Sequence, residues 1–80
     1  MKVLDVLKVV PHDQSTIIDV YENGHLKYCS IMDYAETAGD VLLKMRADIL
    51  GLEVTEISAK KWEDPLDKKE KITLSIVSDN

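Results

Sequence analysis

Cysteine and aromatic residues are scarce in this chain, and their scarcity limits what the chain can be. Cys29 is the one cysteine among 80 residues, so an internal disulfide is excluded and a reducing, cytoplasmic setting is expected. Phenylalanine is absent and Trp62 is the one tryptophan, so the core must be mainly aliphatic. Long apolar runs are missing too. Charged residues interrupt Met1–Val10, so we expect neither a signal peptide nor a membrane span.

The residue patterns of catalysis and of metal binding are also missing. The three glycines form no phosphate-binding motif. His12, His25 and Cys29 show neither a CxxC nor an HxxxH spacing, whereas a zinc site needs about four ligands. On one strand His25 would lie about 13 Å from Cys29, too far to activate it as a nucleophile. We therefore expect no metal, no cofactor and no enzymatic activity.

Basic side chains are outnumbered by acidic ones, 10 to 15, which gives a net charge of −5. An acidic protein is repelled by nucleic-acid backbones unless its cations cluster. The candidate cluster is Lys60–Lys71, which holds five lysines, but four interleaved acids nearly cancel their charge. We expect a solvated loop there, in which Trp62 and Leu66 cover the edge of the core, and no nucleic-acid binding.

An apolar content of 45% is sufficient for one folded domain that spans residues 1–80. A first helix, ending near Val9 ahead of Pro11, is predicted by apolar residues at helical spacing: Val3, Val6, Leu7 and Val10. A second helix is predicted by a longer apolar stripe from Ile31 to Ile49. Gly39 lies inside this stripe as a possible break, and Gly51 stands where a glycine commonly ends a helix.

Asn23-Gly24 predicts a β-hairpin between strands Ser15–Tyr21 and His25–Ser30. A two-residue turn would set Glu22 opposite His25, whereas a three-residue loop would set Tyr21 opposite His25. We prefer the three-residue loop, because it gives one apolar face composed of Ile18, Val20, Leu26 and Tyr28. The opposite face, which includes Ile17 and Tyr21, would then be turned to water or to a partner.

Two further strands complete the predicted fold. Leu52–Ala59 predicts a third strand with a bulge near Thr55-Glu56, and Lys71–Val77 predicts a fourth. The order α-β-β-α-β-β predicts an α+β fold, a four-stranded antiparallel sheet with the helices packed on one face. The predicted core consists of Val6, Leu7, Val10, Ile18, Val20, Leu26, Tyr28, Tyr34, Ala38, Leu42, Met45, Ile57, Ile72, Leu74 and Ile76.

Three segments carry a resemblance to a known group of proteins. They are the leading amphipathic helix Val3–Pro11, the strand Thr16–Gly24 with its Glu-Asn-Gly turn, and Leu52–Ser58 ahead of the last strand. With them the chain resembles short, acidic, uncharacterised proteins of phages and prophages of Gram-positive bacteria. The resemblance implies a small accessory protein and carries no functional residue over. Within that class, counter-defence proteins cover a host enzyme or sequester a small signalling ligand.

The expected function is non-enzymatic protein–protein interaction, with a homodimer as one form that the association can take. Apolar and aromatic residues left over from the predicted core indicate the contact surface: Ile17, Tyr21, Trp62 and Leu66. One alternative is an inhibitor that mimics nucleic acid with an acidic surface composed of Asp33, Glu36, Asp40, Glu53 and Glu56. Another is a protein that sequesters a small ligand at a subunit interface.

Overall fold

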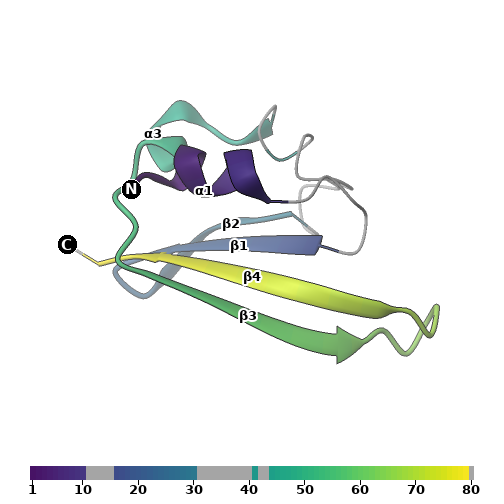
Figure 1. Ribbon diagram of the computed structural model, residues 1–80. Helices are drawn as coiled ribbons and strands as arrows, with labels where there is room; N and C mark the ends of the chain where they lie inside the picture. The colour runs from purple at the N-terminus through teal and green to yellow at the C-terminus, as the bar shows by residue number, and fades with distance from the viewer. Residues whose placement is uncertain (11–15, 31–40, 42–43, 80) are drawn as a thin grey trace.

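Four strands form one mixed sheet in the computed structural model, which describes residues 1–10, 16–30, 41 and 44–79. In sheet order they are β2 (His25–Cys29), β1 (Thr16–Glu22), β4 (Glu70–Ser78) and β3 (Glu56–Glu63). The β1–β2 and β3–β4 pairs are antiparallel, but β1 and β4 run parallel (Figure 1). The predicted α+β class is confirmed, and the prediction of a fully antiparallel sheet is wrong.

The parallel pair brings together the two most apolar strands. Ile18 lies opposite Leu74, and Val20 lies opposite Ile76, in the middle of the sheet. Each hairpin is fixed locally by its own turn, but local pairing does not decide which strands join the two hairpins. Joining them through β1 and β4 covers both edges of the strands that have most apolar area to bury, and it leaves β2 and β3 at the sheet edges.

The β1–β2 hairpin has the two-residue turn. Asn23 and Gly24 both have positive φ, 50° and 83°, and Glu22 lies opposite His25. The preferred three-residue loop is therefore wrong. The register then shifts, because Tyr21 lies opposite Leu26 but Val20 lies opposite Tyr28. The extra residue, Lys27, turns Tyr28 onto the same face as Val20, while Leu26 stays outside with 46% of its surface exposed.

Strand β3 is displaced along the chain from the strand predicted at Leu52–Ala59, since it begins at Glu56 and ends at Glu63. Strand β3 continues through Trp62 to Glu63, so Lys60 and Lys61 lie on a strand and not on the solvated loop expected for them. At its start, the Thr55 N–H donates to the Val77 carbonyl at 2.8 Å while Glu56 is the residue paired with Val77. Two residues therefore face one, as in the bulge predicted for this position.

The first predicted helix is present as α1 (Val3–Val9), and it buries Val3, Val6 and Leu7. A single turn, α3 (Ala47–Leu50), follows later in the chain. The helix predicted up to Ile49 is interrupted at Arg46, whose backbone is extended with φ −66° and ψ 150°. Gly51 caps α3 with φ −85°, so no left-handed residue is needed there.

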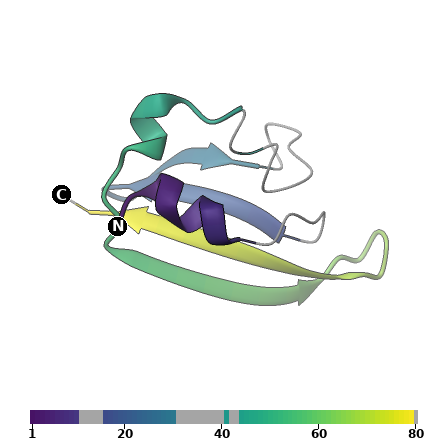
Figure 2. The same cartoon turned by 45° about the horizontal axis from the view of Figure 1, so that its top comes forward.

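Both described helices lie on the same side of the sheet in two views (Figures 1 and 2). The stretch that includes Gly39, and with it most of the second predicted helix, lies outside the described residues. The packing of all helices on one face therefore stays a prediction. Strand β3 is clear of α1 and α3 in Figure 2, and the far end of the β3–β4 hairpin projects beyond them.

Backbone contacts fix the start of α1 to the segment that leads into β3. The Val3 N–H donates to the Leu52 carbonyl at 3.0 Å, and the Val54 N–H donates to the Met1 carbonyl at 2.8 Å. Side chains reinforce this link, since the Lys2 ammonium lies 3.1 Å from the Glu53 carboxylate. The hydrogen bond from Lys2, followed by that from the N-terminal ammonium, lowers the pKa of Glu53.

Aliphatic residues from α1, β1, β4 and the stretch around α3 form the core. Its buried members are Val3, Val6, Leu7, Val10, Ile18, Val20, Val41, Met45, Ile49 and Ile76. Tyr28 and Leu74 pack against this core, as predicted, whereas Leu26 and Ile57 are exposed and were wrongly placed in it. Tyr34, Ala38 and Leu42 lie outside the described residues. Ile17, which the sequence placed on an open face, is buried with 8% exposed.

Candidate interaction surface

Strand β3 forms one edge of the sheet over eight residues, Glu56–Glu63. In an antiparallel pair, residues that bond the neighbouring strand alternate with residues whose N–H and C=O point away. The Asp64 N–H donates to the Lys69 carbonyl at 2.9 Å. Because hydrogen-bonded residues alternate along the strand, the even-numbered residues of β3 are those that form backbone hydrogen bonds with β4. The N–H and C=O groups of Ile57, Ala59 and Lys61 therefore point away from β4, toward the open edge of the sheet.

The free row of backbone groups on an edge strand invites another strand to pair with it, and natural proteins commonly protect such edges with charged side chains, bulges or short strands. The opposite edge, β2, has five residues and is distorted by the bulge at Lys27. No register shift interrupts the pairing of β3 with β4 from Glu56 to Glu63. Strand β3 is therefore the longer and more regular of the two edges.

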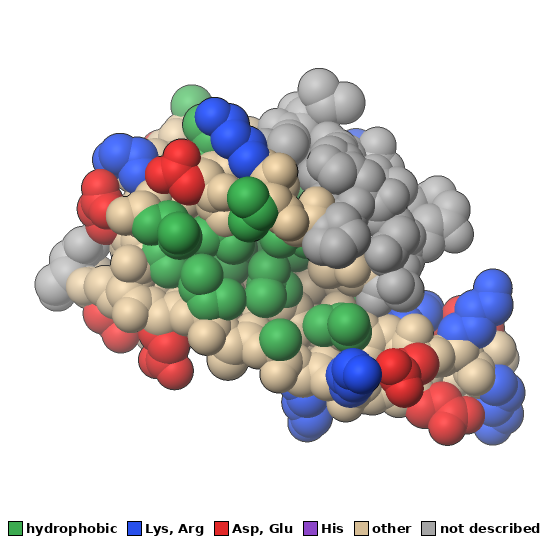
Figure 3. Space-filling model, in the orientation of Figure 1, with side chains coloured by type: hydrophobic (Ala, Val, Ile, Leu, Met, Phe, Trp, Pro, Cys, Tyr) green, Lys and Arg blue, Asp and Glu red, His purple; other side chains and the backbone are tan. Residues whose placement is uncertain are grey.

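The first half of the side of β3 that faces the helix layer is apolar and incompletely covered. Ile57 lies opposite Ile76, and Ala59 lies opposite Leu74, so both point to the face that carries the core. Yet 43% of Ile57 is exposed, and Ala59 is exposed as well. Figure 3 shows hydrophobic side chains gathered over α1 and along the neighbouring strands.

The other side of β3 carries charge. Glu56 and Lys60 point away from the helices and are exposed, and neither forms an ion pair with any residue that the structure describes. Lys61, on the opposite side, lies 3.7 Å from Glu70 across the hairpin. We call the exposed side chains and outward backbone of Glu56–Lys61 the β3 edge.

Sequence reasoning placed Glu56–Ala59 on a strand but missed its continuation through Lys60 and Lys61, because these charged residues resembled a solvated connection, and it did not place the strand at a sheet edge. A usable signal was the alternation of Ile57 and Ala59 with polar residues, followed by Trp62, a residue type that favours strands. Charges at Glu56 and Lys60 are spaced evenly about Ser58, which is a further regularity that a loop does not require.

Three of the four residues predicted for a contact surface share the sheet face that points away from the described helices. Ile17 lies opposite Thr73, and the Trp62 indole N–H donates to the Thr73 hydroxyl at 2.9 Å. Tyr21 lies at the other end of this face, opposite Val77. Because Ile17 is buried, the exposure expected of it is wrong. The role of this face in binding stays a prediction.

Leu66, the fourth predicted residue, lies apart from the others on the loop that joins β3 and β4. Its side chain is 92% exposed. The loop is held by Asp64, whose carboxylate accepts hydrogen bonds from the Leu66 N–H at 2.9 Å and from the Lys71 ammonium at 2.6 Å. The Lys71 hydrogen bond is the main cause of the lowered pKa of Asp64, and the same bond raises the pKa of Lys71.

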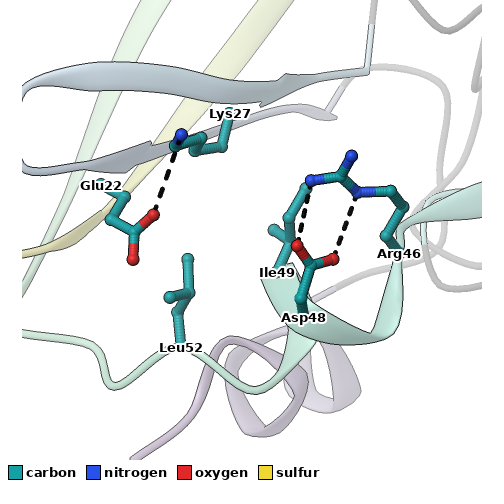
Figure 4. Close-up of a pocket in the computed structure, with 6 residues that line it drawn as sticks. All are labelled: Glu22, Lys27, Arg46, Asp48, Ile49 and Leu52. Atoms are coloured by element: carbon teal, nitrogen blue, oxygen red, sulfur yellow. Dashed lines mark hydrogen bonds and ion pairs between the residues drawn. The ribbon is translucent and has the colours of Figure 1, made fainter.

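A small polar cavity lies between the hairpin turn and α3 (Figure 4). Its volume is about 120 Å³, well below the roughly 300 Å³ at which ligand pockets begin. Two ion pairs line it, Lys27 with Glu22 at 3.9 Å and the Arg46 guanidinium with Asp48 at 3.0 Å. Because each charge already has a partner, the cavity offers no free charge to select a ligand.

No three His, Cys, Asp or Glu side chains within the described ranges are grouped so that they could hold a metal ion. In the same part of the chain, no helix has the length and apolar character needed to cross a membrane. Of the five acids proposed as a nucleic-acid mimic, Asp33, Glu36 and Asp40 lie outside the described residues, so that alternative stays a prediction.

Comparisons of the chain with protein-family models, with curated proteins and with solved structures found no match. A function must therefore be inferred from this chain's own residues.

Proposed function

We propose that this protein is a non-enzymatic interaction module that binds protein through the β3 edge. The observation that carries the proposal is an uninterrupted eight-residue edge strand whose helix side includes two apolar, exposed residues, Ile57 and Ala59. An edge of this kind can accept an extended segment of a partner by adding one strand to the sheet.

The backbone and side chains of the β3 edge determine what a bound partner strand must offer. Backbone groups at Ile57, Ala59 and Lys61 would supply the hydrogen bonds, which require only an extended chain. The side chains would supply selectivity, because a bound strand must present apolar residues to Ile57 and Ala59. On its other face it must present charges complementary to Glu56 and Lys60.

Two sequence-based expectations belong to this proposal. In this proposal the second predicted helix completes the helix layer on the side of α1 and α3, and β3 lies at the margin of that layer. An accessory role of phage or prophage type is supported by the resemblance of Val3–Pro11, Thr16–Gly24 and Leu52–Ser58, and by nothing else.

The test is a substitution that blocks the edge and spares the fold. Ala59→Pro removes an outward N–H, and proline is tolerated on an edge strand at such a position. Ala59→Thr is the matched control, because it changes the side chain but keeps the N–H. Circular dichroism and thermal melting would establish that both variants fold.

We expect wild type and Ala59→Thr to associate, with themselves or with a captured protein, and Ala59→Pro to lose that association. Association that survives in Ala59→Pro would place the contact elsewhere, for instance on the face of Tyr21 and Trp62. A wild-type protein that is monomeric and captures nothing would also overturn the proposal.

A further inference from the structure

We infer that the occupant of the β3 edge is the same edge of a second copy, paired antiparallel about a two-fold axis at Ser58. This inference depends on the proposed function and names its partner. In such a pair Ile57 lies opposite Ala59 of the second copy, and Glu56 lies opposite Lys60 of the second copy. The two-fold axis repeats both contacts.

Two exposed charges on β3 favour pairing with a second copy. Glu56 and Lys60 lie on one face of β3, exposed and without ion pairs to other described residues. Four residues along a strand span about 13 Å, so the two side chains are too far apart to neutralise each other. An antiparallel copy centred on Ser58 sets opposite charges directly across the interface, twice.

Two exposed apolar residues on β3 favour the same alignment. On the helix side of β3, Ile57 and Ala59 flank Ser58 symmetrically, as the charges do on the other side. The same register that pairs the charges sets Ile57 against Ala59 of the second copy, again twice. The exposed surface of Ile57 would be reduced without any change in the rest of the fold.

The outward N–H and C=O groups of β3 also match in this alignment. A two-fold axis perpendicular to the sheet pairs residues of equal parity, so odd-numbered residues meet odd-numbered residues. Those are the residues whose N–H and C=O groups point outward, so Ile57 and Ala59 would exchange hydrogen bonds with their counterparts. Ser58 would meet Ser58 in the close, non-hydrogen-bonded position.

Neighbouring registers are less favourable. An axis at Lys60 would set two Lys60 ammonium groups against each other. An axis at Ala59 would set Ile57 opposite Lys61 and Glu56 opposite Trp62, which loses the charge pairs and leaves Ala59 against Ala59 as the apolar contact. An axis at Ile57 would set Ile57 against Ile57 but Glu56 against Ser58, so among these alignments the axis at Ser58 is the one that pairs Glu56 with Lys60.

Disulfide trapping tests the register. In a Cys29→Ser background, Ser58→Cys would place two sulfhydryl groups on strands about 4.5 Å apart between Cα atoms, within the range that disulfides span. Lys60→Cys in the same background is the control, because its two copies would lie more than about 10 Å apart. We expect mild oxidation to give a covalent dimer for Ser58→Cys and little for Lys60→Cys.

Charge reversal tests the contact in the unmodified strand. Glu56→Lys and Lys60→Glu should each raise the dimer dissociation constant about 10-fold, since each replaces two opposite-charge pairs by like-charge pairs. The double variant Glu56→Lys/Lys60→Glu should restore the wild-type value. Light scattering over a range of concentrations measures all four proteins.

The outcomes separate this inference from the proposed function. A dimer that fails to cross-link through Ser58→Cys and ignores the charge reversals, yet is lost in Ala59→Pro, would overturn the register and keep the β3 edge. A strict monomer would overturn the homodimer, whereas the proposed function would then depend on a captured protein that Ala59→Pro releases.

Discussion

Asp19 lies in the middle of β1, between Cys29 of β2 and Ser75 of β4, on the face away from the described helices. Its Oδ1 atom is buried and has no hydrogen-bond partner among the residues that the structure describes. A buried polar atom without a partner costs roughly 1–3 kcal/mol. Nothing in the described part of the chain offsets that cost, which makes Asp19 the position at which to test it.

Replacing Asp19 by valine should raise the free energy of unfolding by about 1 kcal/mol, because valine suits a strand and leaves no polar atom unpaired. Asp19→Asn is the matched control and should gain less, since the amide oxygen keeps the same surroundings. Urea unfolding of the three proteins measures the difference. A loss of stability in Asp19→Val would show that the carboxylate makes a favourable interaction.

Gly24 is the residue at which backbone conformation most directly restricts the sequence. Its φ is 83°, and apart from Gly24 and its two chain neighbours no described residue has an atom within 4 Å of the position that an added methyl group would take, so Gly24→Ala would be strained in its backbone alone. We expect a loss of about 1–2 kcal/mol, the usual cost of a left-handed conformation for an L-residue.

Gly51→Ala is the control for that substitution. Gly51 has φ −85°, and an added methyl group would lie at an ordinary 3.5 Å from the Ala47 carbonyl oxygen. The free energy of unfolding of the Gly51→Ala variant should be unchanged or should rise by up to about 1 kcal/mol, because alanine restricts the conformations of the unfolded chain. Equal losses in both variants would contradict the assignment of strain to Gly24. Thermal unfolding suffices for the comparison.

At the scale of elements, the turn between β3 and β4 links stability to pH. The lowered pKa of Asp64 means that its contribution is present above its unfolded value of 3.8 and is lost as pH falls through the folded value. The raised pKa of Lys71 means that its contribution is full below 10.5 and is lost as pH rises through the folded value. Both act together between these limits.

Asp64→Asn should therefore be less stable than wild type at neutral pH, and the difference should vanish in acid, where wild-type Asp64 is protonated. Lys71→Met should likewise be destabilised at neutral pH. Lys69→Met, on the same turn but outside the ion pairs found among the described residues, should have a smaller effect. Urea unfolding at several pH values measures these differences, and a loss in Asp64→Asn that persists in strong acid would contradict the ion pair as its cause.

The elements that the sequence predicted well are those with local causes. Asn23-Gly24 supplies two residues that tolerate positive φ, and the spacing of Val3, Val6 and Leu7 suits one helix face. The register beyond the turn was not predictable in this way, because the shift at Lys27 depends on burying Tyr28 against a core formed by distant residues.

The end of β3 and the strand order required information that no local window contains. Lys60 and Lys61 resemble a loop until the pairing of Trp62 with Lys71 and its indole hydrogen bond to Thr73 are known. The parallel β1–β4 pair depends on the relative apolar content of strands that lie far apart in the sequence, so hairpin rules could not give it.

At the scale of the whole molecule, Ile57 and Ile76 lie opposite each other on β3 and β4 but have different surroundings. Ile76 is fully buried, whereas 43% of Ile57 is exposed at the margin of the core. Ile76→Val should cost about 1 kcal/mol at every protein concentration, because it leaves a small cavity in the core. In dilute solution Ile57→Ala should cost a similar amount, since its side chain is only partly removed from water.

The two costs should diverge as the protein is concentrated. Pairing of β3 edges stabilises the folded chain by mass action, and Ile57→Ala removes a contact that exists only in the pair. We therefore expect the cost of Ile57→Ala in urea unfolding to grow with concentration and that of Ile76→Val to stay constant. A cost of Ile57→Ala that does not change across the range would mean that Ile57 has the same neighbours at all concentrations, and would oppose pairing through β3.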